Sequence, residues 1–220
     1  MGKLIVILLG VMRSILINFK IFPIKIALKL PLLISPFVKI KSLKGKILIK
    51  NSEIKFGMIK IGFGEVGIFD EVFSRTILQI NGKMIFNGKA SISHGSRISI
   101  GTTGELEIGK NFNITAETTI VCHNYIKFGD DNLISWGNLF LDTDFHKIIR
   151  ENKKEDKNKN IIIGNNVWIG CRNTFLKGSR VSDNSVIGAS SLLNKEFIKT
   201  NVLIAGNPAK IIEENIKWEN

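Results

Sequence analysis

Cysteine, proline and histidine are scarce in this chain. Its 220 residues include two cysteines, four prolines and three histidines. Cys122 and Cys171 provide no disulfide framework, which favours a reducing, cytoplasmic setting. The chain also lacks CxxC, HExxH, Walker-type and dinucleotide-type glycine patterns. These absences argue against the zinc, redox and nucleotide-binding classes that such motifs identify.

The three histidines, His94, His123 and His146, stand far apart. The gaps between them are 29 and 23 residues. A three-histidine zinc site of the gamma carbonic anhydrase type takes two of its ligands from positions a few residues apart, so this spacing argues against it. We therefore expect a protein that requires no metal.

Acidic residues are almost missing from the N-terminal region, which is strongly basic. Residues 1–60 carry twelve Lys or Arg against one acid, Glu53, and so account for +11 of the whole chain's net charge of +12. The uncharged run between Lys3 and Arg13 is nine residues long, about half of the ~20 that a membrane-spanning helix needs. No small-residue cleavage site follows it, as a signal peptide would require. The pattern predicts a basic, apolar, partly helical extension over residues 1–45.

Two interpretations of this extension stay open. In the first it is an amphipathic segment on an anionic membrane surface, with apolar side chains in the acyl boundary and lysines toward the headgroups. In the second it is a subdomain that covers the open end of a repeat domain. The two are compatible. Nucleic acid is a poor third partner, because the basic residues alternate with aliphatic side chains and no recognition motif accompanies them.

A fixed interval of six residues separates apolar positions in the C-terminal third. They are Ile163, Ile169, Phe175, Val181, Ile187 and Leu193. This period fits neither the 3.6 of a helix nor the 2 of a strand. It is typical of the hexapeptide repeat, in which each short flat face of a coil points one apolar side chain inward and small residues allow the corners. Three faces, from Ile163 to Val181, close one coil of 18 residues.

The same period continues upstream in a looser register. The apolar positions of three earlier coils are Phe86, Ile92 and Ile98, then Ile108, Ile114 and Ile120, then Phe128, Ile134 and Phe140. From Phe128 to Ile163 the step is 35 residues, so 17 residues beyond one coil must leave the solenoid. Residues 147–160 are mostly Lys, Glu, Asp and Asn, too polar to pack inside. We predict a loop insertion at 147–160, and loops of this length in compact domains are usually functional or disordered.

The C-terminal coils carry motifs that resemble a known family. Residues 161–170 read IIIGNNVWIG, residues 183–191 read DNSVIGASS and residues 205–210 read AGNPAK. In this order they resemble the hexapeptide-repeat O-acetyltransferases, which include maltose, galactoside and surface-polysaccharide sugar acetyltransferases. The resemblance extends over about residues 100–212, roughly half of the chain.

This resemblance implies an all-β solenoid, a left-handed parallel β-helix, over residues 46–205, followed by a tail with a short C-terminal helix over residues 206–220. It also implies a homotrimer with active sites between subunits. The expected reaction is direct transfer of an acetyl group from acetyl-CoA to a sugar hydroxyl. The expected acceptor is a surface polysaccharide or its lipid-linked precursor, at the inner face of the cytoplasmic membrane.

The resemblance also assigns roles by position. His146 is the expected general base on the acceptor hydroxyl. The expected acceptor contacts are Asp142, Asp144, His123 and Asn124. The expected acetyl-CoA path, in which the backbone N–H of Cys171 bonds the thioester oxygen, is formed by Trp168, Cys171, Ala189, Asn194, Lys195 and Lys210.

Two positions depart from the maltose-type pattern. His123 replaces an acidic residue used on the acceptor, which makes a free disaccharide a doubtful substrate. Glu213 stands where those enzymes often have a second basic residue.

The alternative to an enzyme is a non-catalytic trimeric hexapeptide-repeat scaffold. His146, Trp168 and the complete C-terminal coils favour the enzyme.

Overall fold

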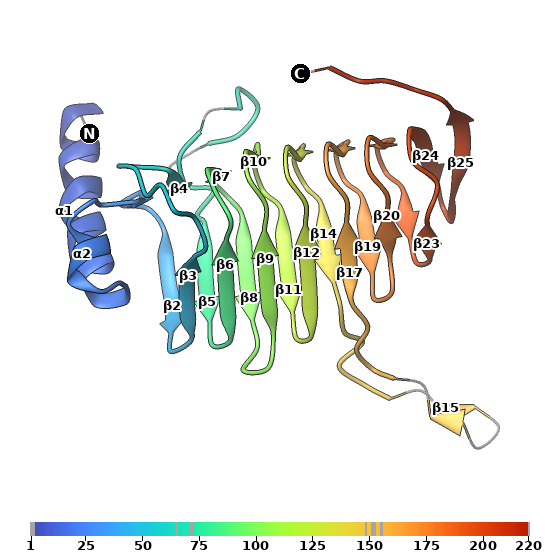
Figure 1. The fold of residues 1–220 in the computed structure, drawn as a ribbon, viewed down its shortest axis with the longest axis horizontal. Helices are drawn as coiled ribbons and strands as arrows, with labels where there is room; N and C mark the ends of the chain where they lie inside the picture. The colour runs from blue at the N-terminus through green and yellow to red at the C-terminus, as the bar shows by residue number, and fades with distance from the viewer. Residues whose placement is uncertain are drawn as a thin grey trace.

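Three parallel sheets wind into a β-helix that the chain enters through an N-terminal helix (Figure 1). The computed structural model describes residues 3–64, 66–70, 73–147, 149–150, 153–154 and 156–219. Successive strands pass from one sheet to the next, so each coil stacks on the coil before it. The predicted left-handed parallel β-helix is thus confirmed.

The strands of the three sheets repeat in the order A, B, C along the chain. Sheet A contains β1 (Leu32–Ile34), β4 (Ile59–Ile61), β7 (Ala90–Ile92), β10 (Phe112–Ile114), β13 (Leu133–Ile134), β18 (Trp168–Ile169), β21 (Val186–Ile187), β24 (Val202–Gly206) and β25 (Ala209–Glu214). Sheet B contains β2 (Lys39–Leu43), β5 (Ile77–Ile80), β8 (Arg97–Ile100), β11 (Thr119–Cys122), β14 (Leu139–Leu141), β19 (Thr174–Leu176) and β22 (Leu192–Leu193). Sheet C contains β3 (Lys46–Ile49), β6 (Lys83–Phe86), β9 (Glu105–Ile108), β12 (Tyr125–Phe128), β17 (Ile161–Ile163), β20 (Arg180–Val181) and β23 (Glu196–Phe197).

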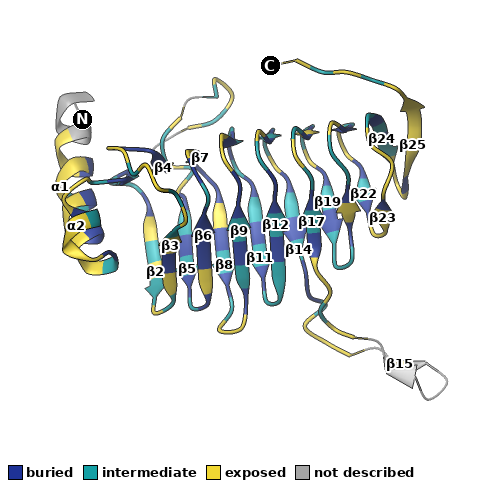
Figure 2. Cartoon of the chain, viewed as in Figure 1, coloured by how far each residue is buried: buried dark blue, intermediate teal, exposed yellow. Residues whose placement is uncertain are grey.

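The apolar positions of the six-residue period form the core. In sheet C, Phe128 pairs with Ile163, which pairs with Val181. Each of the three side chains is at most 1% exposed, and the burial of the rows is visible in Figure 2. Equivalent rows run along the other two sheets and confirm the register predicted from the sequence; they contain Ile134, Ile169 and Ile187 in sheet A, and Phe140, Phe175 and Leu193 in sheet B.

Extra residues in the looser coils gather at the corner between sheets B and C. Strands β8, β9, β11 and β12 there have four residues each, which lengthens their coils beyond 18 residues. The long insertion leaves at the same corner, after β14, and returns at β17 (Figure 1). We call residues 142–160 the excursion. It begins before the predicted residue 147, and it contains the antiparallel pair β15 (Ile149–Arg150) and β16 (Lys153–Lys154). Residues 148, 151, 152 and 155 lie outside the described part of the chain.

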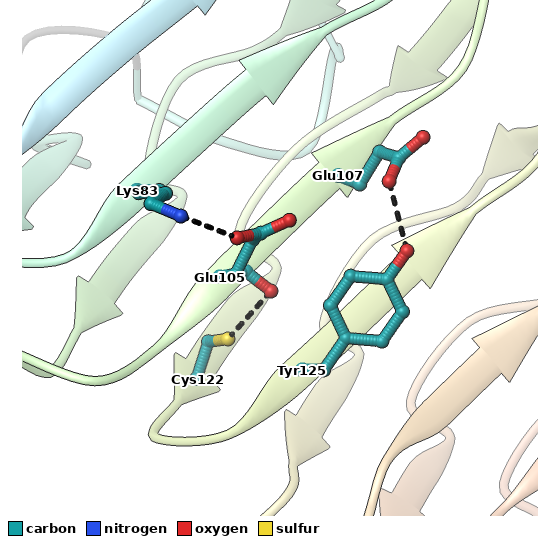
Figure 3. Close-up of polar contacts among 5 residues, drawn as sticks. All are labelled: Lys83, Glu105, Glu107, Cys122 and Tyr125. Atoms are coloured by element: carbon teal, nitrogen blue, oxygen red, sulfur yellow. Dashed lines mark hydrogen bonds and ion pairs between the residues drawn. The ribbon is translucent and has the colours of Figure 1, made fainter.

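The outer surface of sheet C carries a polar network between neighbouring coils (Figure 3). The hydroxyl of Tyr125 donates to Glu107 at 2.8 Å, and the side-chain amide of Asn87 donates to the same carboxylate at 2.9 Å. Burial raises the pKa of Glu107, but these two hydrogen bonds and the nearby Lys127 and Lys50 lower it overall below its ordinary value. Burial and the adjacent carboxylate raise the pKa of Tyr125. The pair therefore links adjacent coils as an ionised carboxylate with a neutral phenol.

Helix α1 (Lys3–Ile21) lies across the open edge of β1 and is followed by the short α2 (Ile24–Ala27). The side-chain amide of Asn18 donates to the carbonyl of Leu32 at 2.7 Å, and its oxygen accepts from the Leu32 N–H at 3.3 Å. The hydroxyl of Ser14 accepts from the N–H of Ile34 at 2.9 Å. Two helix side chains thus pair with the edge strand as another strand would. The interpretation of the extension as a cap is confirmed.

The cap joins the β-helix earlier than predicted. The first coil begins at Leu32, so the extension ends before that residue and not at residue 45. Within the described part of the chain, no helix has the length and apolar content needed to cross a bilayer.

The predicted C-terminal helix is wrong. Strand β25 instead turns back and pairs antiparallel with β24, with Ala205 opposite Lys210. Gly206, with φ of 109°, makes the turn possible in a backbone region that favours glycine. Without β25, the outer edge of β24 would expose unpaired N–H and C=O groups, so pairing outweighs the helical preference of residues 209–214.

Replacing Asn18 by alanine should destabilise the fold, because it leaves the N–H and C=O of a buried edge residue without partners. We expect the unfolding free energy to fall by about 2–4 kcal/mol, measured by urea denaturation at fixed protein concentration. Lys20→Ala, an exposed change in the same helix, is the control and should cost little. A loss below about 0.5 kcal/mol for Asn18→Ala would show that the cap does not depend on this pairing.

Candidate active site at the root of the excursion

The excursion is anchored at its first residue by a buried carboxylate. Asp142 is 0% exposed, and its two oxygens accept hydrogen bonds from the backbone N–H groups of His123 at 2.7 Å and Asn124 at 2.8 Å. The carboxylate therefore fixes the corner between β11 and β12 against the start of the excursion. Burial, and then Asp142, raise the pKa of the neighbouring Cys122 thiol. That thiol lies 3.3 Å from the carbonyl oxygen of Glu105 (Figure 3) and is not a nucleophile.

A second carboxylate holds the excursion two residues further on. Asp144 forms an ion pair with the ammonium of Lys177 at 2.5 Å, and Lys177 follows β19 on the next coil. The same ammonium donates to the carbonyl of Asp156 on the returning arm. Backbone bonds from Asp144 to Lys157 and from Lys159 to Asp142 join the two arms. The root of the excursion is thus rigidly connected to the solenoid.

His146 follows directly after these anchors. Its backbone N–H donates to the carbonyl of Asp144 at 2.6 Å, and Phe145 between them has a left-handed φ of 58°. The His146 side chain is exposed, and within the described residues its imidazole makes no polar contact. The ring therefore extends from a fixed backbone, and within the described part of the chain no group bonds to either ring nitrogen.

The predicted acceptor residues meet beside this histidine. The ring of His123 packs edge-on against Phe145, with centroids 5.0 Å apart. The ring of His123 also lies close to Gly101, since a Cβ added to Gly101 would stand 2.7 Å from the His123 Nδ1. Asn124 donates through its side chain to Asn160 at 2.7 Å. The fold thus brings residues 123–124 and 142–146 together at one corner, as their predicted common role requires.

Asp142 is the exception within this group. Its side chain has no exposed surface, and both oxygens are occupied by backbone N–H groups. His123 and Asn124 are partly exposed at this corner, whereas the carboxylate that orients their backbone is inaccessible to a ligand.

The predicted acetyl-CoA residues begin on another side of the chain. Trp168 points outward from sheet A and is 40% exposed. Its indole packs against that of Trp218, with centroids 6.2 Å apart, and the Trp218 indole N–H donates to the carbonyl of Asn166 at 2.9 Å. Trp218 was not predicted from the sequence, because no motif surrounds it and only the returning C-terminal segment places it beside Trp168.

At the corner between sheets A and B, several backbone N–H groups have no acceptor among the described residues, and those of Cys171 and Ala189 are two of them. Cys171 and Ala189 occupy equivalent positions one coil apart, and Ser190 donates to the carbonyl of Cys171 at 2.9 Å. The neighbouring N–H groups of Gly170 and Arg172 are both satisfied, whereas those of Cys171 and Ala189 have no acceptor in the described chain. Free N–H donors at a corner suit a developing negative charge on oxygen.

The remaining predicted cofactor residues are spread over two places. Asn194 and Lys195 are exposed at the corner between sheets B and C, where the ammonium of Lys195 lies 5.5 Å from the centroid of the Phe197 ring. Lys210 and Glu213 are exposed on β25, the edge strand of sheet A. Within one chain, the predicted site residues therefore do not form a single cleft.

Comparison with known proteins decides the family. No family model matches the chain. An uncharacterized 24.8 kDa protein in the cps region of Klebsiella pneumoniae is 31% identical over 204 residues, which cover 92% of this chain and 87% of that protein. A galactoside acetyltransferase solved in complex with coenzyme A is 32% identical, with a TM-score of 0.51 and coverage of 66% of each chain. The polySia-specific acetyltransferase NeuO, at 23% identity, has the same fold, with a TM-score of 0.59 over 86% of this chain and 79% of its own.

This chain belongs to the hexapeptide-repeat acetyltransferase family. It is accordingly an acyltransferase, and acetyl-CoA is the co-substrate of its family. The resemblance found in its C-terminal motifs is confirmed.

Removing the buried carboxylate of this acetyltransferase should loosen the corner that carries the candidate site. Asp142→Ala leaves two N–H groups without acceptors, and we expect the unfolding free energy to fall by about 2–4 kcal/mol. Glu196→Ala, which removes an exposed carboxylate at the start of β23 in sheet C, is the control. If the two variants unfold at the same urea concentration, the carboxylate does not anchor the corner.

Proposed function

We propose that this protein transfers an acetyl group from acetyl-CoA to a sugar hydroxyl, with His146 as the general base. The observation that carries the proposal is the free, exposed imidazole of His146 directly after two anchored carboxylates, Asp142 and Asp144. A general base needs a fixed backbone and a ring nitrogen that no other group occupies. The free N–H of Cys171 supplies the second requirement of acyl transfer, a donor for the oxyanion.

The proposed reaction is a direct displacement. A ring nitrogen of His146 takes the proton of the acceptor hydroxyl while the hydroxyl oxygen bonds to the thioester carbonyl carbon. The carbonyl oxygen becomes an oxyanion and accepts from the Cys171 N–H, a donor worth about 3 kcal/mol of barrier. The carbon–sulfur bond then breaks, and the CoA thiolate takes the proton from His146. The products are the acetylated sugar and CoA, without an acyl-enzyme.

We propose a homotrimer, because the two halves of this reaction lie at different corners of one chain. His146 lies at the corner between sheets B and C, whereas Cys171 lies at the corner between sheets A and B. A neighbouring subunit that packs along sheet B can bring these corners together. The outward side chains of sheet B include the half-buried Leu139, Leu141 and Leu176, which suit a subunit contact.

The other residues take roles around this reaction. His123, Asn124 and Asp144 would contact the acceptor, and Asp142 would act as a positioning residue for the first two. Trp168, together with Trp218, would form a wall of the cofactor cleft. The remaining residues along the proposed acetyl-CoA path are Ala189, through its backbone N–H, and Asn194, Lys195 and Lys210, of which the two lysines are cations suited to phosphate.

We further propose that the acceptor belongs to a surface polysaccharide or its lipid-linked precursor, and that the protein works in the cytoplasm at the inner face of the cytoplasmic membrane. Support comes from the two named structures, one specific for polysialic acid and the other a galactoside acetyltransferase. A non-catalytic scaffold is the second candidate. It would not need an unoccupied imidazole on an anchored backbone, as His146 provides.

Replacing the proposed base should abolish turnover without loss of the cofactor. His146→Ala is expected to lower kcat by about 10²- to 10⁴-fold and to leave CoA affinity within about twofold, because the side chain holds no cofactor atom. Turnover with saturating acetyl-CoA and an acceptor glycan, and calorimetric CoA binding, are the measurements. Lys147→Ala, the next exposed residue on the excursion, should stay active. If His146→Ala keeps more than about a tenth of wild-type turnover, another group is the base.

Mixed oligomers test the site between subunits. His146→Ala and Trp168→Ala change residues that would enter each site from different subunits. Each variant alone should be weakly active or inactive. If equal amounts of the two chains assemble at random, about a quarter of the sites receive an unchanged His146 from one subunit and an unchanged Trp168 from the other, so about a quarter of wild-type activity should return. Mixed oligomers as inactive as the separate variants would place both residues in one chain's site.

A further inference from the structure

The inner side of helix α1 combines polar side chains with the buried Ile17, whereas its outer side is largely apolar. The inner side carries Ser14 and Asn18, which are 1% and 0% exposed and bond to β1, and Arg13, which donates to the carbonyl of Pro36. The helix approaches this edge closely, since a Cβ on Gly10 would stand 3.3 Å from Pro36. A helix that only covered the end of the solenoid would turn polar side chains to solvent. The exposed side chains of α1 are instead mostly apolar.

The outer side of α1 and the adjacent α2 form a continuous apolar surface. The most exposed of its side chains are Leu16 at 73%, Leu28 at 67% and Ile24 at 66%. We call this surface the end face; it contains Leu8, Leu9, Met12, Ile15, Leu16, Phe19, Ile24 and Leu28. Figure 2 shows the exposed outer side of the two helices, opposite the stacked coils. Apolar patches of this kind mark sites of association.

The charge around the end face is of one sign. Lys20, Lys25 and Lys29 are exposed on and just beyond the two helices. The first acid in the chain is Glu53, and it pairs with Lys55 at 3.1 Å. An anionic bilayer surface has two layers, negative headgroups above an acyl boundary. The leucines and the phenylalanine of the end face suit the acyl boundary, and the lysines, which form no ion pair among the described residues, suit the headgroups.

We propose that the end face docks the protein on an anionic lipid bilayer. The helix axis lies across the axis of the solenoid (Figure 1), so docking through the end face would stand the β-helix roughly upright on the membrane. The excursion then projects sideways from the upright solenoid, and the C-terminal coils lie furthest from the lipid. This inference goes beyond acetyl transfer and stands whether or not His146 is the base.

Flotation with lipid vesicles tests the docking surface on the full chain without any turnover. The probes are vesicles of phosphatidylcholine alone and of phosphatidylcholine with phosphatidylglycerol. We expect binding to the anionic vesicles at low salt, with a loss as added salt shortens the Debye length from ~10 Å at 0.1 M to ~3 Å at 1 M. Met12→Glu with Leu16→Glu should lower the bound fraction at least about tenfold. These side chains point away from β1, so thermal unfolding should stay unchanged.

Matched variants separate the contributions. Ile198→Glu adds a negative charge at an equally exposed apolar position, 74% exposed, next to β23 at the other end of the solenoid, and should bind like the wild type. Changing Lys20, Lys25 and Lys29 to Gln should remove the salt-dependent part of binding. Wild-type protein that ignores anionic vesicles at low salt overturns the proposal. The proposal is also overturned if the wild type associates with itself through the end face. In that case the molecular mass measured by sedimentation would fall in the variant that combines Met12→Glu with Leu16→Glu.

Discussion

Each coil of this protein depends on its neighbours to bury its inward side chains. The aromatic column through the core shows the dependence most directly. Phe112 packs on Phe128, Phe128 on Phe140 and Phe140 on Phe175, with centroids 5.0, 5.0 and 4.4 Å apart. Each ring belongs to a different coil or face, so no coil is stable alone. Two consequences follow: both ends of the stack must be closed, and an inserted segment can leave only at a corner.

The two ends are closed by different means. At the N-terminal end, Asn18 and Ser14 of a helix satisfy the edge strand through side chains. At the C-terminal end, β25 satisfies β24 through backbone pairing. The first solution leaves the far side of the helix free, and in this chain that side is apolar and surrounded by lysines. The second solution places the segment after β25 along sheet A, where Trp218 reaches Trp168.

From Phe86 to Leu193 the sequence predicted one core residue on each face of each coil, because the six-residue period records which side chains point inward; the core residues of the earlier coils, such as Leu32, Ile59 and Leu78, were not predicted. The insertion was also predictable, since the step from Phe128 to Ile163 is too long for one coil. The period says nothing about chain ends. The sequence therefore predicts a helix where the chain forms a strand at 209–214, and it predicts an extension where the first coil begins at Leu32. The bonds of Asp142 could not be predicted either, because they depend on the corner between β11 and β12.

A crystal structure of the assembled protein with bound CoA would test whether His146 of one subunit and the corner N–H of Cys171 of another form one site. We expect three subunits, with the CoA sulfur near the Cys171 N–H of one subunit and facing the imidazole of His146 from its neighbour. CoA bound within a single chain, or away from both residues, would show that the site is not shared between subunits.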